Sequence, residues 1–386
     1  MKIVYCINSI SHMGGIARVV VEKANALAAI EGNEVWIAYT DVDEKHPEPV
    51  SPLDKRVRTI DLMIRYYAKD QLGLYYRIES ATRLRHRHKK ALEKALAPIK
   101  PDVIISVGQS EKYLVPSLKL PCNPALVREF HYAKDYRKYV SASFIGRIKA
   151  WLTDLYDYGW KIRRYDTIAV LTHEDFNRNW SKSKIGNKVH VIPNPLTGGK
   201  GSLPSDLSSK TVVTVGRVAY QKNHESLIRV WSIVTKRHPD WKLYIYGDGE
   251  LYPNLKAQIT SMGLTENVFA PGAVRNASEL LAQSSIFVLT SRYEGFPLVI
   301  PEAYAAGIPT VSYKCPCGPN DIITDGVDGY LVETGDEATM ADRICRLIED
   351  ESLRKQMGEA AIKSCERFTP QKVAGMWMNL FNSIQK

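Results

Sequence analysis

Short apolar segments alternate with amphipathic segments along the whole chain. The apolar segments predict buried strands at residues 2–7, 34–39, 103–107, 125–130, 167–171 and 189–192, and again at 211–215, 242–246, 267–270, 286–290, 309–313 and 329–332. The segments between them carry apolar residues at helical spacing, for example Val20, Ala24 and Leu27. Strands that alternate with helices predict parallel sheets covered by helices on both faces.

A stretch rich in Gly, Ser and Pro interrupts this alternation from Pro193 to about residue 209 and is typical of a linker. The chain is therefore expected to form two doubly wound α/β domains, residues 1–195 and 196–369. Residues 370–386 have apolar positions at helical spacing and predict a closing helix that packs back on the first domain. Ligands of such sheets bind beyond the carboxyl ends of the strands, so we expect a central cleft between the domains.

Composition narrows the function classes without choosing one. The 386 residues are 45% hydrophobic and 24% charged, which is typical of a globular protein, and the net charge of +10 favours an anionic partner. Nucleic acid, an anionic membrane and phosphorylated small molecules all meet that requirement. No apolar run reaches the length of a membrane span and the first residues do not resemble a secretory signal, so the expected location is cytoplasmic. Six scattered cysteines argue against a disulfide framework, and Cys315-Pro316-Cys317 alone is weak evidence for zinc.

The strongest candidate site lies in the second domain. Glu294 and Glu302 flank a loop that follows a predicted strand and enters a predicted helix, where backbone N–H groups suit a pyrophosphate. Gly216-Arg217 and Lys222 follow the first strand of that domain, and an Arg and a Lys on one loop suit two phosphates. The structural alternatives are a capped helix with solvated acids and a surface loop with solvated cations.

Two candidates lie in the first domain. Met13-Gly14-Gly15 follows the first strand and fits a close approach of backbone to phosphate or sugar, although an ordinary tight turn fits equally well. The pattern Gly-x-Gly-x-x-Gly is absent there, which argues against a dinucleotide cofactor. His131 ends another strand, where it either contacts a sugar or serves the fold.

In type and order, these residues resemble the motifs of the retaining GT-B enzymes of glycosyltransferase family four. Within that family, they are most similar to the motifs of members that build bacterial surface glycans. The resemblance rests on Gly216-Arg217, Lys222, Glu294-Gly295-Phe296 and Glu302, then on residues 315–323 and 328–332. It is sharp over about residues 211–335 and looser before, where Gly14-Gly15 and His131 carry it.

The resemblance implies a role for each matching residue. Arg217 and Lys222 would bind the donor diphosphate, with Gly216 and Gly15 approaching it. Glu294 would contact the donor sugar, Glu302 the ribose and His131 the sugar near the reacting carbon. Backbone at Phe296 and Leu298 would bind phosphate or sugar, and Ala273 and Val274 would flank the base. Two positions depart from the family: Pro297 lacks an N–H, and Tyr132 stands where many relatives have an Asp that could orient the histidine.

The implied reaction moves a hexose or N-acetylhexosamine from a nucleotide-diphosphate sugar, UDP before GDP, to a glycan or lipid-linked acceptor with retention. The departing phosphate takes the acceptor proton, so Glu294 is not assigned as a nucleophile. No metal or other cofactor is expected, and Asp41-Val42-Asp43 is interpreted as a polar loop. The alternatives are a sugar-nucleotide epimerase of the same fold and a basic nucleic-acid-binding protein. Against the second alternative, the sequence has no recognisable nucleic-acid-binding module.

Two basic amphipathic segments raise the hypothesis of a peripheral membrane enzyme. In residues 74–97 an apolar stripe is accompanied by a cluster of Arg, Lys and His, which fits either an anionic membrane or a core-facing helix with a solvated basic face. In residues 144–164 the apolar stripe is predicted to be buried.

Overall fold

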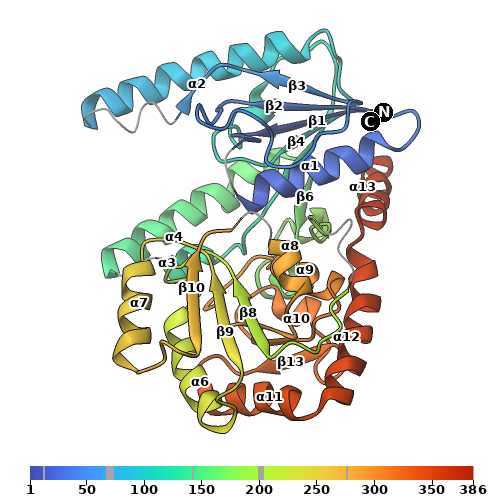
Figure 1. The fold of residues 1–386 in the computed structure, drawn as a ribbon. Coiled ribbons are helices and arrows are strands. Elements are labelled where there is room, and N and C mark those ends of the chain that lie inside the picture. The colour runs from blue at the N-terminus through green and yellow to red at the C-terminus, as the bar shows by residue number, and fades with distance from the viewer. Residues whose placement is uncertain (12–13, 67–73, 141–142, 199–203, 275–276, 386) are drawn as a thin grey trace. The chain divides into compact units, whose positions relative to one another are not determined.

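The computed structural model describes residues 1–11, 14–66, 74–140, 143–198, 204–274 and 277–385, with the side chains of 74–82 left out (Figure 1). The described chain forms two compact units. The N-terminal unit comprises Met1–Leu171, Asp175–Pro195 and Pro370–Lys386, and the C-terminal unit comprises Thr172–Glu174 and Leu196–Thr369. The main divisions fall at the predicted boundaries. Residues 172–174 differ from the prediction, because the backbone N–H groups of His173 and Glu174 donate to the carboxylate of Asp321 in the C-terminal unit.

The N-terminal unit is built on a parallel sheet of seven strands in the order β3-β2-β1-β4-β5-β6-β7. Its strands are β1 (Lys2–Ile7), β2 (Glu34–Tyr39), β3 (Val57–Asp61), β4 (Val103–Ser106), β5 (Ala125–Glu129), β6 (Thr167–Val170) and β7 (Val189–Val191). Both faces of the sheet are buried: Ile3 and Tyr5 join one apolar cluster, Val4 and Cys6 the other. This double burial is why β1 appears in the sequence as a continuous apolar run.

The helices of this unit are α1 (Gly15–Ala28), α2 (Leu74–Leu96), α3 (Tyr136–Val140), α4 (Phe144–Gly159), α5 (His173–Asp175), which crosses the boundary between the units, and α13 (Pro370–Ile384). Short helical turns are η2 (Val115–Ser117), η3 (Lys161–Arg164), η4 (Phe176–Trp180) and η5 (Gly186–Lys188). The closing helix α13 lies beside α1 (Figure 1) and buries Val373, Trp377 and Phe381 in the same cluster as Ile3. The expectation that it packs on the first domain is confirmed.

The C-terminal unit repeats the architecture with six parallel strands in the order β10-β9-β8-β11-β12-β13. They are β8 (Thr211–Val215), β9 (Lys242–Tyr246), β10 (Val268–Gly272), β11 (Ile286–Leu289), β12 (Thr310–Tyr313) and β13 (Gly329–Val332). The helices are α6 (His224–Arg237), α7 (Tyr252–Ser261), α8 (Ala277–Ala282), α9 (Val299–Ala305), α10 (Pro319–Ile322), α11 (Glu337–Glu349), α12 (Glu351–Cys365) and the turn η6 (Glu366–Phe368). Trp231 on α6 and Met340 on α11 are fully buried in its core.

The two amphipathic segments of the N-terminal unit differ in which side of the helix is buried. In the described part of α2, Leu92 and Leu96 are fully buried, so this part of the helix faces the core and leaves a basic side exposed. In α4 the prediction of a buried stripe is wrong. Phe144, Trp151 and Leu155 are more than half exposed, and the inward side of the helix carries Asp157 and Tyr158 instead.

Candidate functional site

The predicted donor residues of the C-terminal unit lie at the point where its strand order reverses. Strands β8 and β11 are direct neighbours in the sheet. The strand that follows β8 in the sequence, β9, lies on one side of this pair, and the strand that follows β11, β12, lies on the other side. Such a switch point opens a crevice beyond the carboxyl ends of the two strands. Gly216 follows β8 directly, and Glu294 lies in the loop that follows β11.

Lys222 and Glu294 form the centre of this site. The Lys222 ammonium lies 2.6 Å from Glu294 Oε1, and both side chains are mostly buried. Ser291 donates its hydroxyl to the same oxygen at 2.6 Å, and the Gln221 amide donates to Oε2 at 3.3 Å. Three donors thus fix the carboxylate, which leaves about one of its lone-pair positions for a ligand hydroxyl.

The loop that carries Lys222 is fixed by glycines from two strand ends. A Cβ at Gly216 would lie 3.2 Å from Lys222 Cε, so the absence of a side chain there makes room for the lysine stem. Gly247 and Gly249, directly after β9, have φ of +154° and +158°. A Cβ at Gly247 would lie 1.9 Å from the carbonyl oxygen of Gly216, so only glycine allows the two loops to approach this closely.

Arg217 is placed differently from Lys222. Its side chain is 73% exposed and pairs with Glu250 at 3.0 Å rather than with a group of the buried cluster. Lys222 and Glu294 are therefore joined to each other, whereas the guanidinium of Arg217 is held at the surface.

Glu302 lies on α9, which follows the loop that carries Glu294. Glu302 is 6% exposed on α9 and accepts a hydrogen bond from Thr197 Oγ1 at 2.7 Å. Phe296 turns its ring inward onto Phe368, with ring centroids 5.4 Å apart, so its side chain serves the fold. Leu298 precedes α9 and is partly buried. Gly318 packs so closely on Pro297 that an added Cβ would lie 2.5 Å from its Cδ.

Ala273 and Val274 follow β10, on the same edge of the sheet as the other loops because all its strands are parallel. Ala273 is exposed and Val274 partly exposed. Their predicted contact with a base stays a prediction, as do the ligand roles of the other residues.

In the N-terminal unit, Gly14 and Gly15 follow β1 at the switch point between β1 and β4. Both are exposed, and a Cβ at Gly14 would meet no atom within 4 Å, so space does not require a glycine there. Met13, the first residue of that motif, lies outside the described residues.

His131 has an acidic neighbour that the sequence analysis did not find. Its Nε2 lies 3.0 Å from Glu129 Oε1, and Glu129 also forms an ion pair with Lys23 of α1. Burial raises the pKa of Glu129, but Lys23 and His131 outweigh it and hold that pKa at about 2. Burial lowers the pKa of His131, with Glu129 opposing, so the imidazole is neutral at pH 7. Residues two apart in a strand share a face, which is the signal that could have revealed Glu129.

The aspartates weighed as metal ligands accept hydrogen bonds from neighbouring residues of their own loop, and the two cysteines are buried. Asp41 accepts a hydrogen bond from Thr40 at 2.6 Å, and Asp43 accepts one from the backbone N–H of Lys45. Cys315 and Cys317 are buried and form no disulfide bond. Within the described ranges, no group of three or more His, Cys, Asp or Glu side chains is arranged to hold a metal ion.

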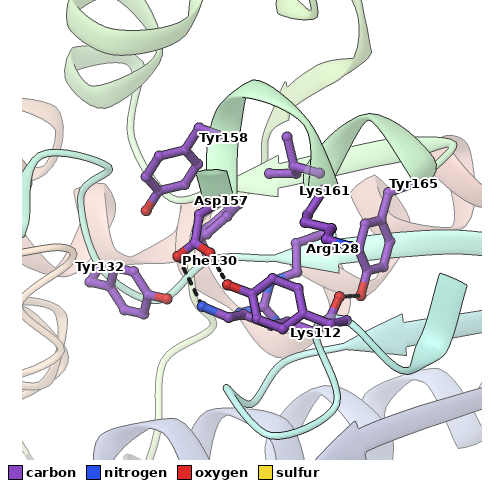
Figure 2. A pocket seen from close by; sticks show the side chains of 10 residues that line it. Lys112, Arg128, Phe130, Tyr132, Asp157, Tyr158, Lys161 and Tyr165 are labelled. Carbon is purple, nitrogen blue, oxygen red and sulfur yellow. Dashed lines mark hydrogen bonds and ion pairs between the residues drawn. The ribbon is translucent and has the colours of Figure 1, made fainter. Parts of the chain in front are cut away.

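A second hollow lies in the N-terminal unit between β5, α4 and η3 (Figure 2). Three cations line it together with aromatic rings: Lys112, Arg128 and Lys161. Lys112 is paired with Asp157 at 2.9 Å. Arg128 is 2% exposed and donates Nη1 to Ser106 and Gly108, while its Nη2 has no hydrogen-bond partner among the described residues. A buried guanidinium with a spare donor makes this hollow a candidate anion site.

Comparisons with known proteins place both units in one family of enzymes. A family profile described as "Glycosyltransferase Family 4" matches residues 13–197, and one described as "Glycosyl transferases group 1" matches residues 200–364. The two matches meet at the linker between the units.

Individual relatives differ in how much of them the chain covers. An exopolysaccharide phosphotransferase of Streptomyces coelicolor is 30% identical over 298 residues, 76% of this chain but 30% of the relative. A Campylobacter jejuni α-1,4-N-acetylgalactosaminyltransferase, named for a PP-undecaprenol-linked glycan, is 26% identical over 390 residues and covers 100% of this chain and 99% of its own. The chain thus spans less than a third of the first of these and nearly all of the second.

The crystal structure of TarM superposes with a TM-score of 0.78 at 16% identity, covering 99% of this chain and 98% of that one. This similarity confirms the fold. None of the helices in the described ranges combines the length and the hydropathy that crossing a bilayer requires.

Proposed function

Because the chain belongs to family four of the glycosyltransferases, which have the GT-B fold, we propose that it is a retaining glycosyltransferase of bacterial surface-glycan synthesis. Its donor is a nucleotide-diphosphate hexose or N-acetylhexosamine, with UDP as the expected nucleotide and GDP as the alternative. Its acceptor is a glycan or a lipid-linked glycan in polysaccharide or lipopolysaccharide synthesis. The relative named for a PP-undecaprenol glycan, which matches along its whole length, supports the lipid-linked acceptor.

The observation that carries the proposal is the Lys222–Glu294 pair at the switch point of the C-terminal sheet. An ammonium has three N–H donors, so Lys222 retains donors for a phosphate while it holds Glu294. As the bond to the sugar breaks, negative charge grows on the β-phosphate, and a preorganised cation stabilises it there. Arg217 supplies a second cation once its guanidinium leaves the exposed pair with Glu250.

Glu294 acts in this proposal by orienting the sugar. Its carboxylate is held by Lys222, Ser291 and Gln221, which suits a fixed hydrogen-bond acceptor for a sugar hydroxyl. The departing phosphate takes the proton of the acceptor hydroxyl on the same face of the sugar, so no protein nucleophile is required and the configuration is retained. His131, neutral at pH 7, is available to hydrogen-bond the sugar, with Glu129 fixing its ring.

No metal takes part in the proposed reaction, because Lys222 and Arg217 provide the positive charge. The protein is also proposed to work on the inner face of the cytoplasmic membrane, where a lipid-linked acceptor would lie.

The test is a screen of purified protein against a panel of nucleotide sugars, with slow hydrolysis of the donor as the readout and EDTA present in a parallel series. Release of UDP or GDP from one donor, undiminished by EDTA, is the expected result. Product analysis with an acceptor then separates transfer from epimerisation, since a new glycosidic bond of retained configuration is expected and an epimer of the donor would contradict the proposal.

A further inference from the structure

Helix α4 is amphipathic, but its apolar side faces the solvent and its acidic side faces the protein. Nine of the eighteen large apolar side chains that the described residues expose lie between Val140 and Trp160. On α4 they recur with helical spacing and form one stripe: Phe144, Ile145, Ile148, Trp151, Leu152, Leu155 and Tyr156. Contiguous apolar patches of this kind mark interaction sites, because water exposure of so many large side chains is unfavourable.

The inward side of α4 carries its acids. Asp157 pairs with Lys112 at 2.9 Å and with Arg137 at 2.8 Å, and Asp154 also pairs with Arg137. The helix is therefore fixed to the N-terminal unit through its polar side. This arrangement leaves the apolar stripe free for an external partner.

Positive charge surrounds the apolar stripe. Arg147, Lys149, Arg163 and Arg164 are exposed, and Lys161 lies over the rings of Trp160 and Tyr156. Both acids of this segment are paired inward, so the outward charge is uniformly basic. Large apolar and aromatic side chains with basic residues at their edges are typical of helices that lie in the interface of an anionic bilayer. A second copy of the chain suits this surface poorly, because a twofold interface would bring the same basic residues together.

The pocket in Figure 2 adjoins this surface, since Asp157 and Tyr158 of α4 line it and Lys161 follows the helix. The unpartnered Nη2 of the buried Arg128 and the Lys161 ammonium provide donors for an anion there. One element thus presents an apolar face to the outside and a cationic pocket behind it.

We propose that α4 docks this protein on an anionic lipid bilayer, with its apolar stripe in the interfacial layer and the phosphate of one lipid headgroup in the pocket beside it. The proposal locates the membrane association that the proposed function assumes. Vesicle binding requires no glycosyl transfer, so either can fail alone.

The first experiment measures cosedimentation of the full chain with vesicles of phosphatidylcholine alone and of phosphatidylcholine mixed with phosphatidylglycerol. Binding to the mixed vesicles, weakened by added salt, is expected. Leu155→Glu should lower the partition coefficient about tenfold. Val327→Glu is the matched control, because Val327 is 52% exposed in the C-terminal unit against 58% for Leu155, and it should bind as the wild type does.

Three results would overturn the docking surface: equal loss of binding by both variants, equal binding to neutral and anionic vesicles, or a dimer in sedimentation velocity that Leu155→Glu dissociates. Donor hydrolysis by Leu155→Glu is expected to match the wild type and verifies that the variant is folded.

The second experiment titrates dihexanoyl phosphatidic acid, a soluble lipid phosphate, and follows tryptophan fluorescence. Lys161→Gln should weaken binding about fivefold, and Lys149→Gln, which removes the same charge from α4 outside the pocket, should have a smaller effect. Equal effects would overturn the assignment of the phosphate to the pocket. Displacement by inorganic phosphate at equal concentration would assign the pocket to a free anion and overturn the lipid ligand.

Discussion

Replacing Glu294 by Gln tests the centre of the proposed donor site with the smallest change of shape. The amide oxygen can still accept from Lys222 and Ser291, which lie 2.6 Å from Oε1. The new NH₂ group faces the Gln221 Nε2, 3.3 Å from Oε2, so two donors then oppose each other. The variant keeps the side-chain volume and loses the charge and one acceptor.

Two magnitudes follow from this geometry. A hydrogen bond to a charged group contributes about 1.5–3 kcal/mol, so the free energy of unfolding should fall by up to that amount. If the carboxylate aligns the sugar in the transition state, turnover should fall about 10²–10³-fold, or about 2.7–4 kcal/mol, as for the loss of one oxyanion donor. Donor affinity should change much less, because Lys222 remains to bind the diphosphate.

The assay is release of nucleoside diphosphate with acceptor present, combined with calorimetric titration of the donor and urea unfolding. Glu333→Gln is the control, since Glu333 forms an exposed pair with Lys314 at 2.9 Å in the same unit and should change neither turnover nor stability by much. Normal turnover of Glu294→Gln would refute the role of this carboxylate. Loss of donor binding with loss of turnover would assign it to diphosphate binding instead.

Two further changes test the cation and the glycine contact of the same site. Arg217→Ala should lower turnover about 10²–10³-fold without lowering the unfolding free energy by more than about 1 kcal/mol, since its pair with Glu250 is exposed; kinetics and urea unfolding measure both. Gly247→Ala should lower both the unfolding free energy and turnover, because its Cβ would lie 1.9 Å from the Gly216 carbonyl oxygen. The control is Gly263→Ala, where φ is +66° and no atom lies within 4 Å of the added Cβ. Its unfolding free energy should fall by about 1 kcal/mol and its turnover should not change.

The strand pattern was predictable because most strands are buried on both faces and appear in the sequence as apolar runs. Twelve predicted strands correspond to observed ones within a few residues, whereas β3 was missed. Only Val57 of β3 is buried, because β3 is an edge strand that pairs with β2 alone. A strand with so few buried positions gives almost no hydrophobic signal.

The sequence also predicted the elements of the proposed donor site but not its connections. Lys222 and Glu294 are 72 positions apart, and only the register of β8 beside β11 brings them together. The contacts of Gln221 and Ser291 with Glu294 depend on that approach, so the sequence did not predict them. The close contact between the loops after β8 and β9 did have a signal in the sequence, the motif Gly-Asp-Gly that follows β9. Helix α4 was misjudged because spacing shows that one side is apolar without showing which side faces the protein.

The buried group Lys23–Glu129–His131 gives the N-terminal unit a pH dependence of stability whose sign follows from two pKa shifts in the same direction, both downward. The folded pKa of Glu129 is about 2, below the value of about 4.3 for an unfolded chain, so its contribution is complete above about pH 4.3 and is lost as the pH falls toward 2. His131 has a folded pKa below its unfolded value of about 6.5, so the unfolded state binds its proton first and stability falls as the pH drops below about 6.5.

Glu129→Gln tests this assignment because it leaves Lys23, which is 1% exposed, as an unpaired buried cation. Breaking such a pair costs about 3–5 kcal/mol, whereas the double variant Lys23→Met, Glu129→Gln should recover most of that loss. Urea unfolding between pH 4 and pH 8 should also show a steeper loss of stability below about pH 6.5 in the single variant, because His131 no longer has Glu129 to raise its pKa. A single variant as stable as the wild type at pH 7 would mean that Lys23 reaches water, and the buried group would then have no part in fixing His131.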